Sequence, residues 1–233
     1  MMNTKPDLAA LRKDIDALDG ELRQLLRART ELVSKVALSK AQNGDTGTLR
    51  PVREAQQMAA LLAWQKSEAA DLTAPGLLAI WREIISMALA QQGGLTIYAS
   101  PAAMMAARAH FGASLDYVET DAAQALPACA ATPAAVSVVA LDEAQAPQGA
   151  TQVIARLPVT GEAAFLCYGH NGELDEARQI PGFVWLVHRP TPQHGDSVVR
   201  QLANGVLVES QNDAPGADDS VWGGYLPVEG RDA

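Results

Sequence analysis

The feature that most constrains this chain is a long, regular stripe of apolar residues near its N-terminus. Between Asp7 and Gln42 the apolar residues recur at gaps of three and four, at Leu11, Ile15, Leu18, Leu22, Leu25, Leu32 and Val36. This heptad pattern predicts one continuous amphipathic helix. The helix would be about 54 Å long, whereas a compact chain of this length has a radius of gyration of about 17 Å. We therefore expect a partner chain to cover its apolar face.

One position in the stripe is charged. Arg29 stands between Leu25 and Leu32, where the pattern calls for a hydrophobic residue. A guanidinium in a packed seam is unfavourable unless an anion meets it. Lys40 lies three turns later on nearly the same face, about 16 Å away along the helix. Arg12 is about 25 Å from Arg29 and reaches the same ligand only from a partner helix.

These cations have plainer interpretations that remain open. Arg29 could set the register of a coiled coil, as a buried polar residue can. Arg12 and Lys40 could be solvated charges on the helix surface. Their joint spacing with Arg29 favours a small anionic ligand bound between them.

The charge and cysteine content of the chain limit the classes of partner and of binding site that it can have. The net charge of the chain is −9. Residues 1–92 hold 12 Lys and Arg against 11 Asp and Glu, whereas residues 93–233 hold 6 against 16. The acidic remainder argues against nucleic acid or an anionic membrane as the main partner. Cys129 and Cys167 fit neither a disulfide framework nor the spacing of metal ligands. No run of apolar residues approaches the ~20 residues of a membrane span. We expect a soluble, cytoplasmic protein with reduced thiols.

Two further helices are predicted in the first 93 residues, and a different architecture follows them. The two helices run from Pro51 to about Lys66 and from Pro75 to about Gln92. Strands are expected at Leu95–Ser100, Leu115–Glu119 and Ala135–Leu141. They alternate with a helix at Pro101–Phe111 and a helix at Asp121–Ala131 that we expect to be broken near Pro127. The later strand-like runs are expected to form a mainly antiparallel half; they are Gln152–Val159, Ala164–Tyr168, Phe183–His188 and Gly205–Glu209.

Residues 4–92 resemble the all-helical class of chorismate mutase. The resemblance lies in one long helix followed by two shorter ones, with "ALRKDIDALDGEL", "LLRARTELVSKVALSK" and "RPVREAQ" in that order. It implies an intertwined helical homodimer that rearranges chorismate to prephenate without a cofactor or a metal. This pericyclic step has no covalent intermediate, so catalysis depends on charge placement and on holding the reactive conformer.

The resemblance assigns a role to each matching residue. Arg29 would bind one substrate carboxylate, and Arg12 from the partner chain would bind the other end. Lys40 and Gln92 would donate hydrogen bonds to the ether oxygen as negative charge develops there. Glu54 would accept a hydrogen bond from the ring hydroxyl. Gln91 is the alternative to Gln92 if the third helix aligns one residue differently.

Two positions depart from the family pattern. The family has an Arg followed by a Glu where this chain has Gln57 and Met58. The missing Arg is a carboxylate ligand, so we expect Arg53, one turn earlier, to bind the substrate in its place. Met58 cannot accept the hydrogen bond that a Glu would. A small polar residue of the third helix appears here as Ala88.

Residues 95–141 resemble the start of a prephenate dehydratase-like domain of the periplasmic-binding type. The similarity lies in the expected strand and helix ending in "HFG", followed by "AVSVVALD". The chain lacks the Thr-Arg-Phe sequence of dehydratases, so a ligand-sensing or structural role is expected. The predicted fold is therefore a three-helix, intertwined-dimer mutase domain over residues 1–93, then a small α/β domain over residues 94–233.

Two functions other than the mutase also fit parts of this pattern. An isochorismate-pyruvate lyase uses a similar helical dimer, and would differ in the loop before the second helix. A non-catalytic dimer that binds a pathway metabolite is favoured by Gln57 and Met58. His188 and His194, with Asp196 nearby, are poorly spaced for a metal. Cys167 near His170 has no third partner for nucleophilic catalysis.

Overall fold

The computed structural model describes residues 7–44, 49–159, 162, 164–170, 179–211 and 219–227. Contacts within the chain define two units, residues 1–46 and 47–233, and each is described by itself. The domain boundary predicted at residue 93 stays a prediction. The described part consists of helices and a nine-stranded sheet, so the term all-helical fits only its first three helices.

The first unit is the predicted long helix, α1, which spans Leu8–Gln42. Asp7 caps it, because its side chain accepts a hydrogen bond from the backbone nitrogen of Ala9 at 3.0 Å. The sequence also predicts a capping-box start at Thr4, with Asp7 three residues later, and Thr4 lies outside the described residues. No residue of α1 is buried, and its whole apolar stripe is exposed: Leu11, Ile15, Leu18, Leu22, Leu25, Leu32 and Val36.

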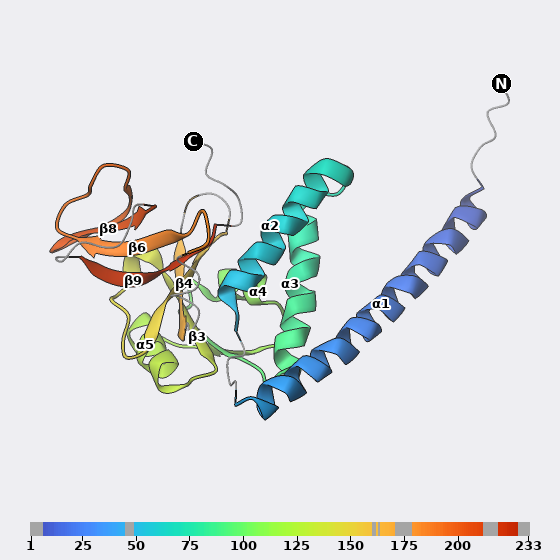
Figure 1. The fold of residues 1–233 in the computed structure, drawn as a ribbon, viewed down its shortest axis with the longest axis horizontal. Helices are drawn as coiled ribbons and strands as arrows, with labels where there is room; N and C mark the ends of the chain where they lie inside the picture. The colour runs from blue at the N-terminus through green and yellow to red at the C-terminus, as the bar shows by residue number, and fades with distance from the viewer. Residues whose placement is uncertain are drawn as a thin grey trace, which may run out of the picture. The chain divides into compact units, whose positions relative to one another are not determined.

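The second unit begins with two helices that pack side by side (Figure 1). Helix α2 spans Pro51–Glu68, and α3 spans Ala74–Gln91; both have a proline in the first turn, as predicted. Met58 and Leu62 of α2 contact the same core as Ile85 and Leu89 of α3. Both helices thus share a hydrophobic core with the sheet that follows them.

Three parallel strands come next, joined by two helices. Strands β1 (Thr96–Ala99), β2 (Asp116–Glu119) and β3 (Ala135–Ala140) lie in the order β2-β1-β3. Helix α4 (Met104–Phe111) links β1 to β2, and α5 (Ala122–Ala131) links β2 to β3. The two connections run in opposite directions along the sheet, so right-handed crossovers place α4 and α5 on opposite faces.

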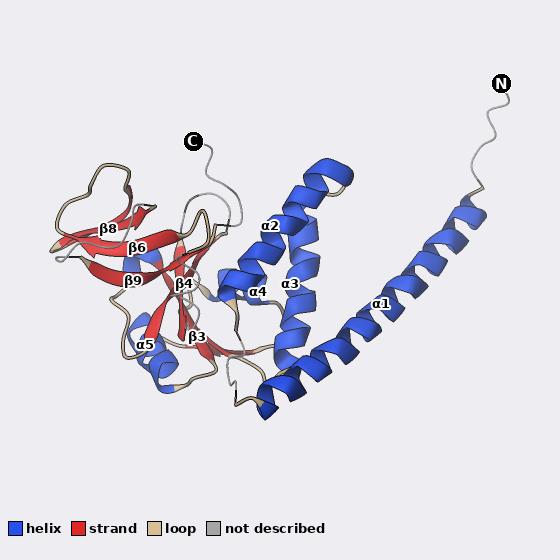
Figure 2. Cartoon of the chain, viewed as in Figure 1, coloured by secondary structure: helices blue, strands red, loops and turns tan. Residues whose placement is uncertain are grey.

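The rest of the sheet is largely antiparallel, as predicted. It contains β4 (Thr151–Leu157), β5 (Phe165–His170), β6 (Val184–Arg189), β7 (Ser197–Leu202), β8 (Gly205–Ser210) and β9 (Ser220–Tyr225). The full order is β2-β1-β3-β5-β4-β9-β6-β8-β7, and Figure 2 shows these strands in red. Among these six strands only the pairing of β4 with β9 is parallel. A nine-stranded mixed sheet replaces the small α/β layer that we expected.

Alternation along the strands divides the core between the two faces of the sheet. In β3, Val136 and Val138 face the cluster formed by α2, α3 and α4, whereas Val139 faces the cluster that contains α5. In β5, Cys167 faces the first cluster, and Leu166 and Tyr168 face the second. This is the period-two pattern of strands buried on both sides.

Two strands and one helix differ from the sequence predictions. The strands β7 and β9 were not predicted: β7 is a half-exposed edge strand, and β9 holds two glycines, which ordinarily weaken a strand. Gly223 has φ 146°, and a Cβ there would collide with the backbone of Val153 in the neighbouring strand. Helix α5 continues through Pro127 instead of breaking, because burial of its flanking side chains against the sheet offsets the lost hydrogen bond.

Candidate functional site

The cations of α1 lie on one uninterrupted helix. Arg29 and Lys40 are half-buried, and Arg12 is exposed. Because α1 is continuous from Leu8 to Gln42, Arg29 and Lys40 project from nearly the same face, about 16 Å apart along the axis. Partial burial strips water from Arg29 and lowers the pKa of its guanidinium. An anionic group is the natural partner of such a cation.

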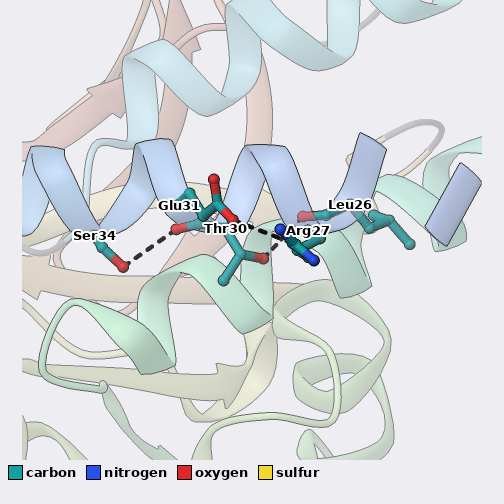
Figure 3. A network of polar contacts seen from close by, with 5 residues as sticks. All are labelled: Leu26, Arg27, Thr30, Glu31 and Ser34. Carbon is teal, nitrogen blue, oxygen red and sulfur yellow. Dashed lines mark hydrogen bonds and ion pairs between the residues drawn. The ribbon is translucent and has the colours of Figure 1, made fainter. Parts of the chain in front are cut away.

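Neighbours of Arg29 satisfy their polar groups within α1 (Figure 3). The Thr30 hydroxyl donates to the carbonyl oxygen of Leu26 at 2.9 Å, and the Ser34 hydroxyl donates to that of Thr30 at 3.3 Å. Arg27 forms an exposed i, i+4 ion pair with Glu31 at 3.2 Å. Such surface pairs contribute at most about 1 kcal/mol. Arg27 is therefore a suitable control for experiments on Arg29.

The predicted residues of α2 fall into different environments. Arg53 and Gln57 are exposed, whereas Met58 is 0% exposed and lies in the core. Glu54 lies in the first turn, and its side chain is only 12% exposed. Its carboxylate forms an ion pair with Nη1 of Arg82 at 3.5 Å. The place where the family has a second Glu is thus a packing position in this chain.

Gln92 occupies the C-cap of α3 and is half-buried. Its side-chain Nε2 donates to the carbonyl oxygen of Ala88 at 3.0 Å. The amide therefore satisfies one of the last carbonyls of its own helix. Gln91, the alternative, is exposed at the end of α3.

Arg82 is a buried charge that the sequence analysis did not single out. It is 7% exposed on α3, and desolvation lowers the pKa of its guanidinium, an effect that Glu54 opposes. A signal was present in the sequence, because Arg82 lies four residues after Leu78 and three before Ile85, within the apolar face of the helix. The same reasoning had identified Arg29.

Glu54 and Arg82 line a cleft in the second unit. The cleft lies between the start of α2, the middle of α3, the end of α4, and strands β4 and β9. Its other polar side chains are His110, Arg156 and Tyr225. Desolvation, aided by the Arg82 charge, lowers the pKa of His110 well below its ordinary value.

Residues 11–93 match the family model for chorismate mutase type II. This segment, about a third of the chain, is therefore similar to chorismate mutase type II domains. The match spans α1, α2 and α3, and indicates an isomerase with chorismate mutase activity. At the level of the family, such a domain converts chorismate to prephenate. It also supports a small-molecule substrate and a role in aromatic biosynthesis.

No curated protein and no solved structure matches the chain. The resemblance of residues 95–141 to the start of a prephenate dehydratase-like domain is therefore not confirmed. Within the part of the chain that the structure describes, no helix is long and apolar enough to cross a membrane.

The residues considered for a metal or a nucleophile have structural roles. The Asp196 carboxylate accepts from Arg189 Nη1 at 2.9 Å and from the backbone nitrogen of Gln193 at 2.7 Å. The described residues contain no group of three or more His, Cys, Asp and Glu arranged for a metal ion. Cys129 and Cys167 are free and buried, and burial raises the pKa of both thiols.

Proposed function

We propose that this protein rearranges chorismate to prephenate in aromatic amino-acid biosynthesis, at a site built around Arg29 and Lys40. The observation that carries the proposal is their position on one face of a continuous helix within the matched segment. Chorismate is a dianion that needs paired cations, and its ether oxygen gains negative charge in the transition state. A guanidinium binds a carboxylate through two hydrogen bonds, and a lysine donates to a single atom.

Each residue has a proposed task. Arg29 binds one carboxylate, and Arg12 of the partner subunit binds the other. Lys40 donates to the ether oxygen together with Gln92, whose cap hydrogen bond to Ala88 orients its amide. These donors stabilise the transition state more than the substrate, because the oxygen charge is largest there.

Two residues of α2 complete the proposed substrate site. Arg53 is exposed and supplies the guanidinium that is absent at position 57. Glu54 accepts a hydrogen bond from the ring hydroxyl while Arg82 holds its carboxylate in place. The protein also restricts the substrate to its compact reactive conformer, which is an entropic contribution to rate.

We propose a homodimer, as the family resemblance implies. The support from this chain is the exposed stripe of α1, in which Leu25 is 66% and Leu32 is 61% exposed. Large side chains of this kind gain about 1.5–3 kcal/mol each when fully buried, so a second copy of α1 is a fitting cover. A cytoplasmic location stays a prediction from the sequence.

The test is chorismate turnover by the purified protein, with the product identified. We expect prephenate, and a rate that falls about 100-fold or more in Lys40→Ala, as when a donor to a developing negative charge is removed. Lys35→Ala is the matched control, because Lys35 is an exposed lysine of the same helix. Pyruvate and salicylate from isochorismate would instead indicate the lyase. The loop that separates these activities includes residues 45–48, which lie outside the described residues.

A mixing experiment tests the role of Arg12 in a shared site. Arg12→Ala and Lys40→Ala chains are each expected to be nearly inactive. In a mixed dimer one of the two sites has both residues intact, so equal mixing restores about a quarter of wild-type activity. Failure to regain activity, with dimers present by light scattering, would refute a site that uses both chains.

A further inference from the structure

The first turn of α2 carries two residues of the proposed substrate site, Arg53 and Glu54. Its N-cap residue, Arg50, makes no side-chain capping hydrogen bond. The backbone nitrogen of Glu54 donates to the carbonyl oxygen of Arg50 at 3.0 Å, which closes this turn. A helix end without such a cap frays readily. Contacts with the rest of the fold therefore determine how firmly the turn is held.

Val52 is the apolar contact between this turn and the sheet. In α2, all of which the structure describes, it is the only buried residue of the first turn. It forms a hydrophobic cluster with Phe183, which directly precedes β6. The partly buried side chains of Ile180, Trp185 and Leu226 pack against the same cluster. The start of α2 is thus attached to one end of the antiparallel half of the sheet.

The ring of Phe183 is itself held by two interior strands. It packs edge-to-face on the ring of Trp185, with the two centroids 5.1 Å apart. It also lies over Gly224 of β9, where an added Cβ would collide with its Cζ and Cε1 atoms. Trp185 and Gly224 are register partners in the pairing of β6 with β9, and each of these strands has a neighbour on both sides. Phe183 therefore offers Val52 a well-fixed surface.

The turn has a second contact, which is polar. Glu54 pairs with Arg82 of α3 at 3.5 Å, and both side chains are nearly buried. This ion pair orients one side chain only. The contact at Val52 instead fixes the backbone from which both Arg53 and Glu54 project, so its loss would displace both proposed substrate contacts together.

We propose that Phe183 is a positioning residue for the substrate site. Through Val52 it holds the first turn of α2, and with it Arg53 and Glu54, where they bind chorismate. This inference rests on the proposed function, and Phe183 acts through α2 without contacting the substrate. A displacement of about 1 Å in a substrate-binding group is enough to impair catalysis strongly.

Steady-state kinetics of chorismate turnover by the full chain test this role. Phe183→Ala is expected to raise KM about tenfold and to change kcat less than about threefold, because Arg53 and Glu54 bind groups that the substrate and the transition state share. A residue that only stabilised the fold would lower the active fraction, and hence the apparent kcat, without changing KM. In an Arg53→Ala background Phe183→Ala should raise KM by a smaller factor, since one displaced contact is already absent.

Leu207→Ala is the matched control. Leu207 is buried on β8, in a cluster whose described members include no residue of α2. The substitution also leaves a cavity in the sheet, but KM should stay within about twofold of the wild-type value. Phe183→Leu keeps an apolar side chain and decides the question if Phe183→Ala does not fold, because its KM should also rise.

Hydrogen exchange of the free protein tests the contact without any substrate. The amide hydrogens of residues 54–57 should exchange about fivefold faster or more in Phe183→Leu, and at the wild-type rate in Leu207→Ala. The inference is overturned if exchange is unchanged in Phe183→Leu, if KM is unchanged in the Phe183 variants, or if Leu207→Ala raises KM equally. Absence of turnover by the wild type would refute the proposed function, and faster exchange would then still support the contact between Phe183 and α2.

Discussion

Met58 offers a sharp test of how α2 is packed. The family pattern has Glu at this position, where it would face the substrate, whereas here Met58 is 0% exposed in a cluster with Leu62, Ile85 and Leu89. Because Met58 lies in the core, Met58→Glu places a carboxyl group there. The substitution then lowers stability and does not restore a substrate contact.

The expected loss follows from two contributions. Burying a methionine side chain is worth about 1.5–3 kcal/mol, most of which is lost. A buried glutamate must also become neutral near pH 7, and raising its pKa from about 4.3 to 7 costs about 4 kcal/mol at 1.36 kcal/mol per unit. The total of about 6 kcal/mol is comparable to the whole stability of many domains, about 5–15 kcal/mol.

Urea unfolding near pH 7, followed by tryptophan fluorescence, measures this loss, and chorismate turnover is measured in parallel. Met58→Leu keeps the volume and should change stability by less than about 1.5 kcal/mol. Gln57→Arg changes an exposed neighbour of Met58, and its free energy of unfolding should stay within about 0.5 kcal/mol of the wild-type value. The reasoning is refuted if the free energy of unfolding of Met58→Glu is within about 1 kcal/mol of the wild-type value and the variant turns over chorismate faster. Met58 would then face the substrate.

Three further predictions concern buried polar groups. Arg82→Met leaves the Glu54 carboxylate without this partner and should destabilise the protein by about 3 kcal/mol. The double variant Arg82→Met with Glu54→Leu should lose less stability, and a double-mutant cycle in urea measures the difference. The pKa of His110 is lowered in the folded chain, so below about pH 6.5 the unfolded chain binds a proton that the folded chain does not. The free energy of unfolding should therefore decrease as the pH is lowered below this value, by at most about 1.4 kcal/mol per pH unit. The slope should be shallower in His110→Asn, and equal slopes in the two proteins would contradict this prediction. Burial raises the pKa of Cys129 to about 12 and also raises the pKa of Cys167. A thiol reagent at neutral pH should therefore label neither cysteine until the chain unfolds. Prompt labelling of the native protein would contradict this prediction, because it would show that these thiols are accessible.

Local patterns predicted the helices well. The extent of α1 and the proline starts of α2 and α3 follow from periodicity and capping, which act within a few residues. Strand β9 was missed because two of its six residues are glycines, which ordinarily weaken a strand. Gly223 is required only because the backbone of Val153 passes close to it, and these residues are 70 positions apart.

The sequence also determined which residues are candidates for the site. Arg29 was identified as an exception to a hydrophobic pattern, and that judgement needs nothing beyond the spacing of its neighbours. Arg82 is also an exception to a hydrophobic pattern. The importance of Arg82 depends on its partner Glu54, which lies 28 positions away on another helix. Whether a charge within an apolar face is paired is a tertiary property.

Taken by itself, the sequence determined the helix periods, the alternation of buried strands, and the segment that matches a mutase family, because each depends on residues close together in the chain. Only the tertiary structure decided that α2 and α3 share a core with a nine-stranded sheet, and that Arg82 and Arg156 line one cleft. The physical reason is that burial and pairing depend on contacts between residues far apart in the chain, and periodicity carries no information about which of those contacts form.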